Sequence, residues 1–276
     1  MIVDAHQHFW DPAAADYTFL TDELAPIRRA FGPDDLAPLL AEHGVGGTVV
    51  VQARSSLDET CSLLATAAAV PFVLGVVGWA DLTDPGLATA LAGLGDELVG
   101  IRHQVHDEPD PRWLLRADVQ RGLTTVGERG LVYDLLVRAA ELPAAAEAAR
   151  QNPGVSFVVD HLAKPPLREA STEAWAEGLT ALAALPNVVC KLSGLVTEAD
   201  WSSWRKDELV AVLRQVLDWF GPERCLFGSD WPVCLLAAGY GEVLDLVESA
   251  VVELTAYERA AVLGGNAMRV YGLEPD

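Results

Sequence analysis

Residues 2–10 read IVDAHQHFW, an apolar stretch that leads directly into two histidines separated by one residue. Side chains alternate between the two faces of an extended strand, so His6 and His8 are expected on one face, with Asp4 one pleat deeper on that face. Burying two imidazoles costs free energy unless each is hydrogen-bonded or bound to a metal. The stretch therefore predicts a buried first strand that ends in either a hydrogen-bonded histidine pair or a functional site. The other segments of the chain distinguish these two interpretations.

Seven further apolar runs follow this first strand, at residues 47–53, 72–79, 98–103, 131–137, 155–161, 188–194 and 224–230. The runs are almost continuously apolar, which is typical of parallel strands buried on both faces. Helix-like segments separate them, at residues 33–43, 57–69, 87–94, 142–150, 173–185, 207–220, 243–253 and 256–263. This alternation predicts an α/β fold, a single (β/α)8 TIM barrel, with residues 1–276 forming one domain.

Two connections are much longer than the others, residues 11–46 and residues 104–130. Each follows a predicted strand, so each lies at the carboxyl end of the barrel, where active sites of this fold are found. Connections of this length in a compact domain are usually functional or disordered. We therefore expect both to border the functional site.

The composition excludes several classes of function. The 276 residues include 40 acidic and 19 basic side chains, a formal net charge of −21, whereas nucleic-acid binding needs a basic surface and anionic membranes repel an acidic one. There is no apolar run of 18 residues and no signal-peptide pattern, so we expect a cytoplasmic protein. The four cysteines are scattered, which favours neither a disulfide framework nor a thiolate metal site. Nothing in the sequence specifies an oligomeric state.

Polar side chains gather where the predicted strands end: His6, His8, Gln52, Trp79, Arg102, His103, Asp134, Asp160, His161, Lys191, Ser193, Ser229 and Asp230. With His106, five of the six histidines lie at or just beyond these ends, and a barrel brings the ends around one mouth. A carboxylate facing three or more imidazoles can bind a divalent metal or act as a general base on water. Both options indicate hydrolysis or a related carbonyl reaction, because the chain has no phosphate-binding loop and no nucleophile elbow.

Four motifs resemble the amidohydrolase superfamily in its family-2 branch, which contains sugar-lactone and pyrone-dicarboxylate lactonases. They are DAHQHFW (4–10), DHLAKP (160–165), KLSGL (191–195) and FGSDWPV (227–233). The stretch GIRHQVHDEPDP (100–111) is most similar to the L-fuconolactonase and L-rhamnonolactonase group, and the resemblance spans residues 2–272. It implies a (β/α)8 barrel with His6 and His8 on the first strand and an essential aspartate, Asp230, on the last.

The chain departs from the binuclear members of that superfamily at two strands. No lysine ends the fourth predicted strand to carry a bridging carbamate, and no histidine ends the fifth; His161 ends the sixth instead. A two-metal site therefore lacks ligands. The lactonase branch resembles this pattern and includes members thought to work without a metal. A single divalent ion such as zinc, held by His6, His8 and Asp230, is compatible with the pattern but not required by it.

The catalytic roles are predicted as follows. Asp230 deprotonates the attacking water and then passes the proton to the leaving alkoxide. His6 and His8 polarise the lactone carbonyl or hold a metal, and His161 acts similarly; the alternative for each is a structural hydrogen bond. Asp160 is expected on the opposite face from His161, in a structural role.

The predicted substrate-binding residues are Gln52, His103, Lys164 and Trp231. Arg102 and His103 alternate in direction, so one of them is expected to face the mouth, and we favour His103. Trp231 is expected to form an apolar wall against a sugar ring, together with Trp10, Trp79 and Trp113. For Lys164 the alternative is a cap on its own loop.

The sequence thus favours a hydrolase that opens the ester ring of a sugar-acid lactone, such as L-fucono- or L-rhamnono-lactone. Few cationic groups are expected at the mouth, which suits a neutral polyol better than a dicarboxylate. The first alternative keeps the barrel but assigns a metal-dependent amidohydrolase or decarboxylase. The second is a carbohydrate-binding protein without catalysis.

Overall fold

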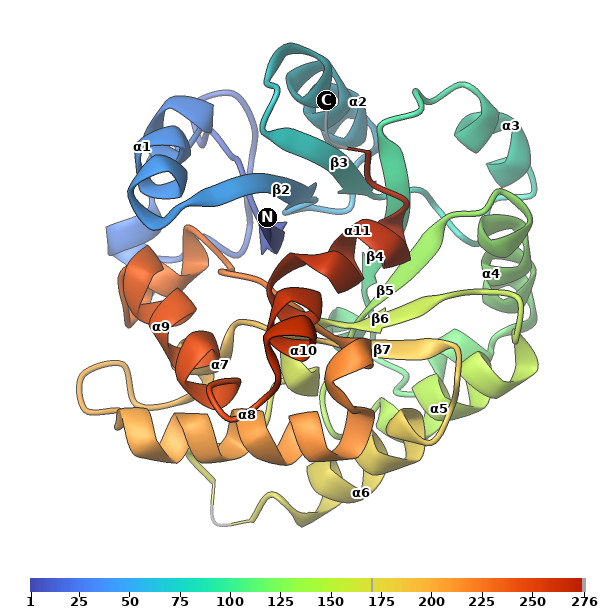
Figure 1. The fold of residues 1–276 in the computed structure, drawn as a ribbon. Helices are drawn as coiled ribbons and strands as arrows, with labels where there is room; N and C mark the ends of the chain where they lie inside the picture. Colours follow the sequence, from blue (N-terminus) through green and yellow to red (C-terminus); the bar gives the residue numbers. More distant parts are fainter. Residues whose placement is uncertain (170, 275–276) are drawn as a thin grey trace.

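The structure is a computed structural model that describes residues 1–169 and 171–274. Within these residues, eight parallel strands pair in sequence order into one sheet, with helices packed around it (Figure 1). The strands are β1 (Ile2–Gln7), β2 (Val45–Val51), β3 (Val73–Gly78), β4 (Leu98–Gln104), β5 (Val132–Leu136), β6 (Phe157–Val159), β7 (Val188–Leu192) and β8 (Cys225–Phe227). Each lies within or overlaps a predicted run, so the predicted (β/α)8 barrel is confirmed.

The sheet closes into a barrel where the end of β1 meets the segment that follows β8. The backbone N–H of Asp230 donates to the carbonyl of His6 at 2.8 Å, and the N–H of His8 donates to the carbonyl of Trp231 at 2.7 Å. The bonds that close the barrel therefore join the residues that the sequence marked as functional.

The α-helices are α1 (Pro33–His43), α2 (Leu57–Ala69), α3 (Leu87–Ala92), α4 (Ala117–Glu128), α5 (Leu142–Gln151), α6 (Glu173–Ala183), α7 (Leu195–Glu198), α8 (Lys206–Phe220), α9 (Tyr240–Ala250), α10 (Ala256–Ala260) and α11 (Asn266–Tyr271). Short turns of other helix types are η1 (Asp22–Ile27), η2 (Val105–Asp107), η3 (Trp113–Leu115), η4 (Asp160–Ala163), η5 (Pro222–Arg224), η6 (Val233–Leu236) and η7 (Ala261–Gly265). In the part of the chain that the structure describes, no helix is long and apolar enough to cross a membrane.

Helix α4 was not predicted, because residues 104–130 were interpreted as one long connection. Its sequence is weakly apolar overall, but Val119, Leu123 and Val126 recur at helical spacing and are buried. Gly122 in the middle of this segment argued against a helix, because glycine is a poor helix former. It is needed there, because a Cβ at this position would lie 2.3 Å from the carbonyl oxygen of Leu82.

The half of the barrel interior that lies away from the mouth is filled by apolar side chains. They come from strands on opposite sides of the sheet and from α11, so they lie inside it: Val3, Ala5, Val49, Val51, Val77, Val132, Val158, Val189, Leu226, Ala267 and Tyr271. Figure 1 shows α10 and α11 lying across the centre of the barrel. The last helices therefore close the floor, and the polar residues occupy the other end.

Strand β1 contains a bulge that changes which side chains point inward. Its pairing with β2 shifts by one residue between Asp4 and Gln7. Val3 and Ala5 point into the barrel, and because of this extra residue His6 and His8 point inward as well. The expectation that Asp4 shares their face is wrong for this reason. Asp4 points outward, where it accepts hydrogen bonds from Ser229 Oγ at 2.6 Å and from the hydroxyl of Tyr240 on α9 at 3.1 Å.

Candidate active site

The residue that follows β8 is held in an unusual backbone conformation. Asp230 has a φ of 56°, in the left-handed region that side chains with a Cβ rarely adopt. Its backbone hydrogen bond to His6 fixes this conformation, and its carboxylate turns toward His6 in β1 and His8 just after it. Strained residues of this kind cluster at functional sites.

The segment after β6 makes a left-handed turn of four residues, His161 to Lys164, with φ between 51° and 56° throughout. Such a turn costs roughly 1–2 kcal/mol for each residue that carries a Cβ. The indole of Trp175 donates to the carbonyl of Leu162 at 2.6 Å and holds the turn in place. The turn directs His161 toward His6, with ring centroids 4.4 Å apart. The sequence contains no glycine here, so nothing in it signalled a left-handed turn.

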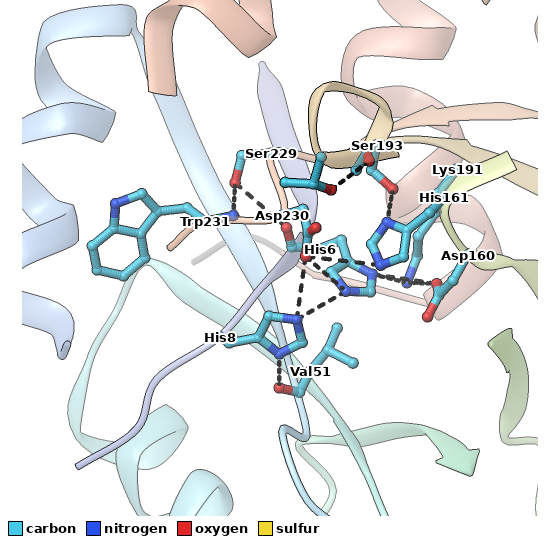
Figure 2. A network of polar contacts seen from close by, with 12 residues as sticks. His6, His8, Val51, Asp160, His161, Lys191, Ser193, Ser229, Asp230 and Trp231 are labelled. Atoms are coloured by element: carbon cyan, nitrogen blue, oxygen red, sulfur yellow. Dashed lines mark hydrogen bonds and ion pairs between the residues drawn. The ribbon is translucent and has the colours of Figure 1, made fainter. Parts of the chain in front are cut away.

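Three imidazoles and one carboxylate converge at the mouth of the barrel (Figure 2). His6 Nε2 lies 3.1 Å from His8 Nε2, and Asp230 Oδ1 lies 3.4 Å from His8 Nε2. The same oxygen lies 3.8 Å from the Nε2 atoms of both His6 and His161. All four residues are at most 4% exposed. The structure therefore brings together every residue predicted to be catalytic.

Each imidazole is anchored through its other nitrogen. His8 Nδ1 lies 2.7 Å from the carbonyl oxygen of Val51, and His161 Nδ1 lies 2.9 Å from Ser193 Oγ. His6 Nδ1 lies 3.1 Å from Lys191 Nζ. Gly194 permits the His161 anchor, because a Cβ there would lie 2.5 Å from His161 Nδ1. All three rings consequently present Nε2 to the same space.

Burial lowers the pKa of His6 and of His161 well below that of free histidine, so both rings are neutral near pH 7. Burial alone would raise the pKa of Asp230, but the neighbouring imidazoles of His161 and His8 outweigh it and lower that pKa. Asp230 is therefore ionised. An ionised carboxylate among neutral imidazoles is suited to accept a proton from water.

The same atoms fit one divalent metal ion. A tetrahedral zinc site with bonds of about 2.0–2.1 Å separates its ligand atoms by about 3.4 Å. The His6–His8 separation is 3.1 Å, and Asp230 Oδ1 lies 3.4 to 3.8 Å from the three Nε2 atoms. Ligand atoms of His6, His161 and Asp230 all lie within 4.8 Å of one another, which adds His161 to the predicted set of His6, His8 and Asp230. The contacts of His8 Nδ1 with the Val51 carbonyl and of His161 Nδ1 with the Ser193 hydroxyl are of the outer-shell kind expected around metal-binding histidines.

A cavity of about 330 Å³ opens above these groups. It is lined by His8, His161 and Asp230 and, around them, by Trp10, Phe19, Arg102, Arg138 and Lys164 among others. A second cavity of about 670 Å³ shares Phe19, Arg138 and Lys164 with it and extends outward past Trp201. The inner cavity is of the size that encloses a small organic ligand.

Of the four predicted substrate-binding residues, Lys164 lines both cavities and pairs with Glu198 at 2.8 Å. The other three do not line the inner cavity. Gln52 is completely buried and lies 3.4 Å from the carbonyl of Arg102, while Trp231 packs against Phe9 and Phe31.

His103 points outward from β4, so the choice of His103 over Arg102 was wrong. His103 stacks on Trp113 at 4.3 Å and accepts from the indole of Trp79 at 3.0 Å, which removes both tryptophans from the predicted wall. Trp10 does line the cavity. Arg102 faces inward because its buried guanidinium is paired there with Asp160, at 2.9 Å.

Asp160 was expected on the outer face, and this expectation is also wrong. Its carboxylate lies 3.2 Å from His6 Nδ1 and 3.0 Å from Lys191 Nζ. Lys191 in turn pairs with Asp134 at 2.5 Å. Burial opposes the ionisation of Asp160, but Lys191 and His6 lower its pKa well below the ordinary value. Strict alternation along β5 and β7, counted from Val132 and Val189, would have placed Asp134 and Lys191 inside.

The prediction that few cationic groups border the mouth is wrong as well, since Arg102, Arg138 and Lys164 line the inner cavity. Two of these charges are matched, Arg102 by Asp160 and Lys164 by Glu198. Among the described residues, Arg138 makes no ion pair. The mouth is therefore more polar than predicted but close to electrically balanced.

Known proteins resemble the chain over almost its full length. It is 44% identical to an L-fucono-1,5-lactonase of Burkholderia multivorans, covering 98% of this chain and 96% of that relative. An L-fucono-1,5-lactonase of Burkholderia ambifaria is 40% identical, with 99% and 96% covered. A solved amidohydrolase structure from Burkholderia multivorans with bound zinc superposes with a TM-score of 0.96 at 43% identity, covering 99% of this chain and 100% of that one. An amidohydrolase family model matches residues 3–273, so the chain belongs to the amidohydrolase family, as its motifs predicted.

Proposed function

We propose that this chain is a lactonase that hydrolyses a sugar-acid lactone, L-fucono-1,5-lactone or a close relative such as an L-rhamnonolactone, to the open aldonic acid. The observation that carries the proposal is the ionised Asp230, whose Oδ1 lies within 3.8 Å of the Nε2 atoms of three imidazoles, beside a cavity of about 330 Å³. The names of the two relatives with 44% and 40% identity support the same substrate class.

In the proposed reaction, Asp230 Oδ1 accepts a proton from a water molecule as its oxygen attacks the lactone carbonyl carbon. The carbonyl oxygen gains negative charge, which the imidazole side of the site stabilises. The bond from the carbonyl carbon to the ring oxygen then breaks, and Asp230 returns the proton to that oxygen. One water is consumed, and the product is a hydroxy acid that ionises in solution.

A divalent metal fits the site, and His6, His8, His161 and Asp230 would hold it. When bound, it would polarise the carbonyl and acidify water. We propose that the reaction does not require it, because Asp230 is already ionised and the three rings are already anchored through Nδ1.

We propose that the substrate ring lies against Trp10 and Phe19, with its hydroxyls toward Lys164 and Arg138. Gln52, His103 and Trp231 are left out of this contact set because they do not line the cavity. They lie behind the lining residues: Gln52 is beside Arg102, and Trp231 packs against Phe9, two residues after the end of β1.

The test is hydrolysis of a lactone panel that contains L-fucono-1,5-lactone, an L-rhamnonolactone and a pyrone dicarboxylate. We expect turnover of the sugar lactones, and a loss of about 10³-fold or more in kcat for Asp230→Asn, because the general base is lost. Asp34→Asn, an exposed change on α1, is the matched control and should keep full activity. Turnover of none of the sugar lactones by the wild type would refute the proposal.

The alternative of a metal-dependent amidohydrolase or decarboxylase is not favoured, because both relatives cited above are lactonases. Two expectations from the sequence also stay proposals: that residues 1–276 are one domain, and that the protein works in the cytoplasm.

A further inference from the structure

The inner cavity beside Asp230 adjoins a second, larger cavity, here called the outer cavity. The two share Phe19, Arg138 and Lys164, and their volumes are about 330 Å³ and about 670 Å³. Pockets that enclose a small organic ligand begin at about 300 Å³, so a single lactone ring needs the inner cavity alone. The proposed substrate therefore leaves the outer cavity unused.

The outer cavity lies at the same end of the barrel as the active site. Its walls come from segments that follow five of the eight strands, and one member of each is Phe19 after β1, Arg138 after β5, Lys164 after β6, Trp201 after β7 and Leu236 after β8. Loops at the carboxyl ends of the strands form the substrate sites of this fold. The outer cavity is therefore an extension of the mouth.

One wall of the outer cavity is the indole of Trp201, which the surrounding residues hold in place. Its N–H donates to the carbonyl of Thr197 at 2.9 Å, and the guanidinium of Arg168 lies 5.3 Å from the ring centre. Arg168 is fixed in turn by hydrogen bonds to the carbonyl oxygens of Ala199 at 2.8 Å and Thr197 at 2.9 Å. An aromatic side chain that is ordered before binding loses little entropy when the C–H surface of a sugar ring packs against it.

The charges that line the outer cavity nearly cancel. The cations are Arg138, Lys164 and Arg168, and the anions are Glu169 and Glu198, with Lys164 paired to Glu198 at 2.8 Å. The lining therefore offers both hydrogen-bond donors and carboxylate acceptors. Hydroxyl groups donate and accept, whereas a phosphate or a carboxylate only accepts, so a neutral polyol matches this lining better than an anion does.

We propose that the outer cavity is a second sugar subsite, so that the enzyme also hydrolyses lactones that carry a neutral sugar ring on one of their hydroxyls. In the proposed pose the lactone hydroxyls face Lys164 and Arg138, two charged residues that line both cavities. A sugar attached to such a hydroxyl enters the outer cavity and packs against Trp201. The inference rests on the proposed lactonase function.

The reaction on such a substrate is unchanged. One water is consumed, and only the ester bond between the lactone carbonyl carbon and the ring oxygen breaks. The glycosidic bond stays intact, so the product is a glycosylated aldonic acid. The outer cavity contributes binding energy and takes no part in the bond changes, which means that its effect belongs in KM and not in kcat.

The experiment compares L-fucono-1,5-lactone with its three monoglucosylated derivatives. For at least one derivative, the wild-type KM should be about tenfold lower than for the free lactone at a similar kcat, because of stacking on an aromatic ring. Trp201→Ala should abolish this difference in KM, and Trp201→Phe, which keeps an aromatic ring, should retain most of it. Leu24→Trp, which enlarges a wall of the outer cavity but not of the inner one, should also abolish it.

Leu57→Trp is the matched control for the filled cavity, because it makes the same change at an exposed position on α2 and should keep both KM values. Turnover of the free lactone without a lower KM for any derivative would overturn the subsite and leave the lactonase function standing. A lower KM that survives both Trp201→Ala and Leu24→Trp would overturn it too, because the second ring then lies elsewhere.

If the wild type hydrolyses no lactone, the proposed function fails and the subsite is decided by binding alone. Calorimetric titration of Asp230→Asn with the free lactone and with the derivatives should then show the same tenfold difference in affinity. Equal affinities, or tighter binding of a lactone that carries a phosphate in place of the glucosyl group, would overturn the subsite.

Discussion

The two ends of the barrel interior differ in what the same strands place there. Toward the floor, inward positions carry Val132, Val158 and Val189, which pack with α11. One inward position further along, the same three strands or their ends carry Asp134, Asp160 and Lys191. A single step of alternation thus separates a dry apolar core from a network of buried charges, and the two halves should respond differently to substitution.

The largest expected effect tests whether the charged half also contributes to stability. Lys191→Met leaves Asp134 and Asp160 without their shared cation, and breaking a buried ion pair in this way costs about 3–5 kcal/mol. Adding Asp134→Asn should recover most of that loss. Urea unfolding of both variants measures this, and equal loss in the single and double variants would show that the charge balance is not the cause.

Asp4, a buried carboxyl group that points away from the barrel interior, can be compared with the charged network inside it. Burial raises the pKa of Asp4 to about 6, above its ordinary 3.8, so the folded state favours the protonated carboxyl. The stability this contributes is complete below about pH 4 and is lost as the pH rises through about 6, a change of about 3 kcal/mol.

Asp4→Asn should abolish this pH dependence, because an amide does not ionise and the hydroxyls of Ser229 and Tyr240 can rotate to accept from it. Relative to the variant, the wild type should lose stability between pH 4 and 7 in urea unfolding. A constant difference across that range would contradict the raised pKa.

Substitutions in the apolar half of the barrel interior should change the stability of the fold but not the catalytic activity. Val158→Ala removes two buried carbons from the inner core and should cost about 2 kcal/mol of unfolding free energy. The kcat of the folded protein should stay within about twofold of wild type, because no polar contact changes. A tenfold loss of kcat would show that packing at the floor sets the geometry of the mouth.

The smallest expected effect concerns the left-handed turn after β6. Ala163 has a φ of 56°, where a Cβ is strained, so Ala163→Gly should stabilise the fold by about 0.5–1 kcal/mol. The matched control is Ala181→Gly, in the right-handed helix α6, which should destabilise by a similar amount. Thermal unfolding of the pair checks the opposite signs.

The parts of the fold that follow from local patterns were predictable. Helix α2 begins and ends as predicted, since Ser56 caps it and an apolar face repeats along it. The meeting of His6, His8, His161 and Asp230 followed from strand ends sharing one mouth. What could not be predicted depends on long-range packing: the bulge that turns Asp4 outward, the left-handed turn without glycine, and helix α4 behind Gly122.

The network of Asp134, Asp160 and Lys191 was missed for a different reason: predicting it requires the inward positions of several strands to be considered at once. Asp160 was assigned outward from its neighbour His161, but the turn that begins there breaks strand alternation. Once Asp160 faces inward, Arg102 follows as its partner and His103 turns outward. The two strands were interpreted separately, so the pairing of Arg102 with Asp160 was missed on both.

The backbone bonds from Asp230 to His6 and from His8 to Trp231 have a kinetic consequence. They join opposite ends of the sequence, so their formation carries a large loop-closure entropy and belongs among the slow, non-local steps of folding. The nucleophile-activating carboxylate reaches the imidazoles through these same bonds. Recovery of catalysis during refolding should therefore coincide with completion of the ring of strands, and lag behind the formation of helices.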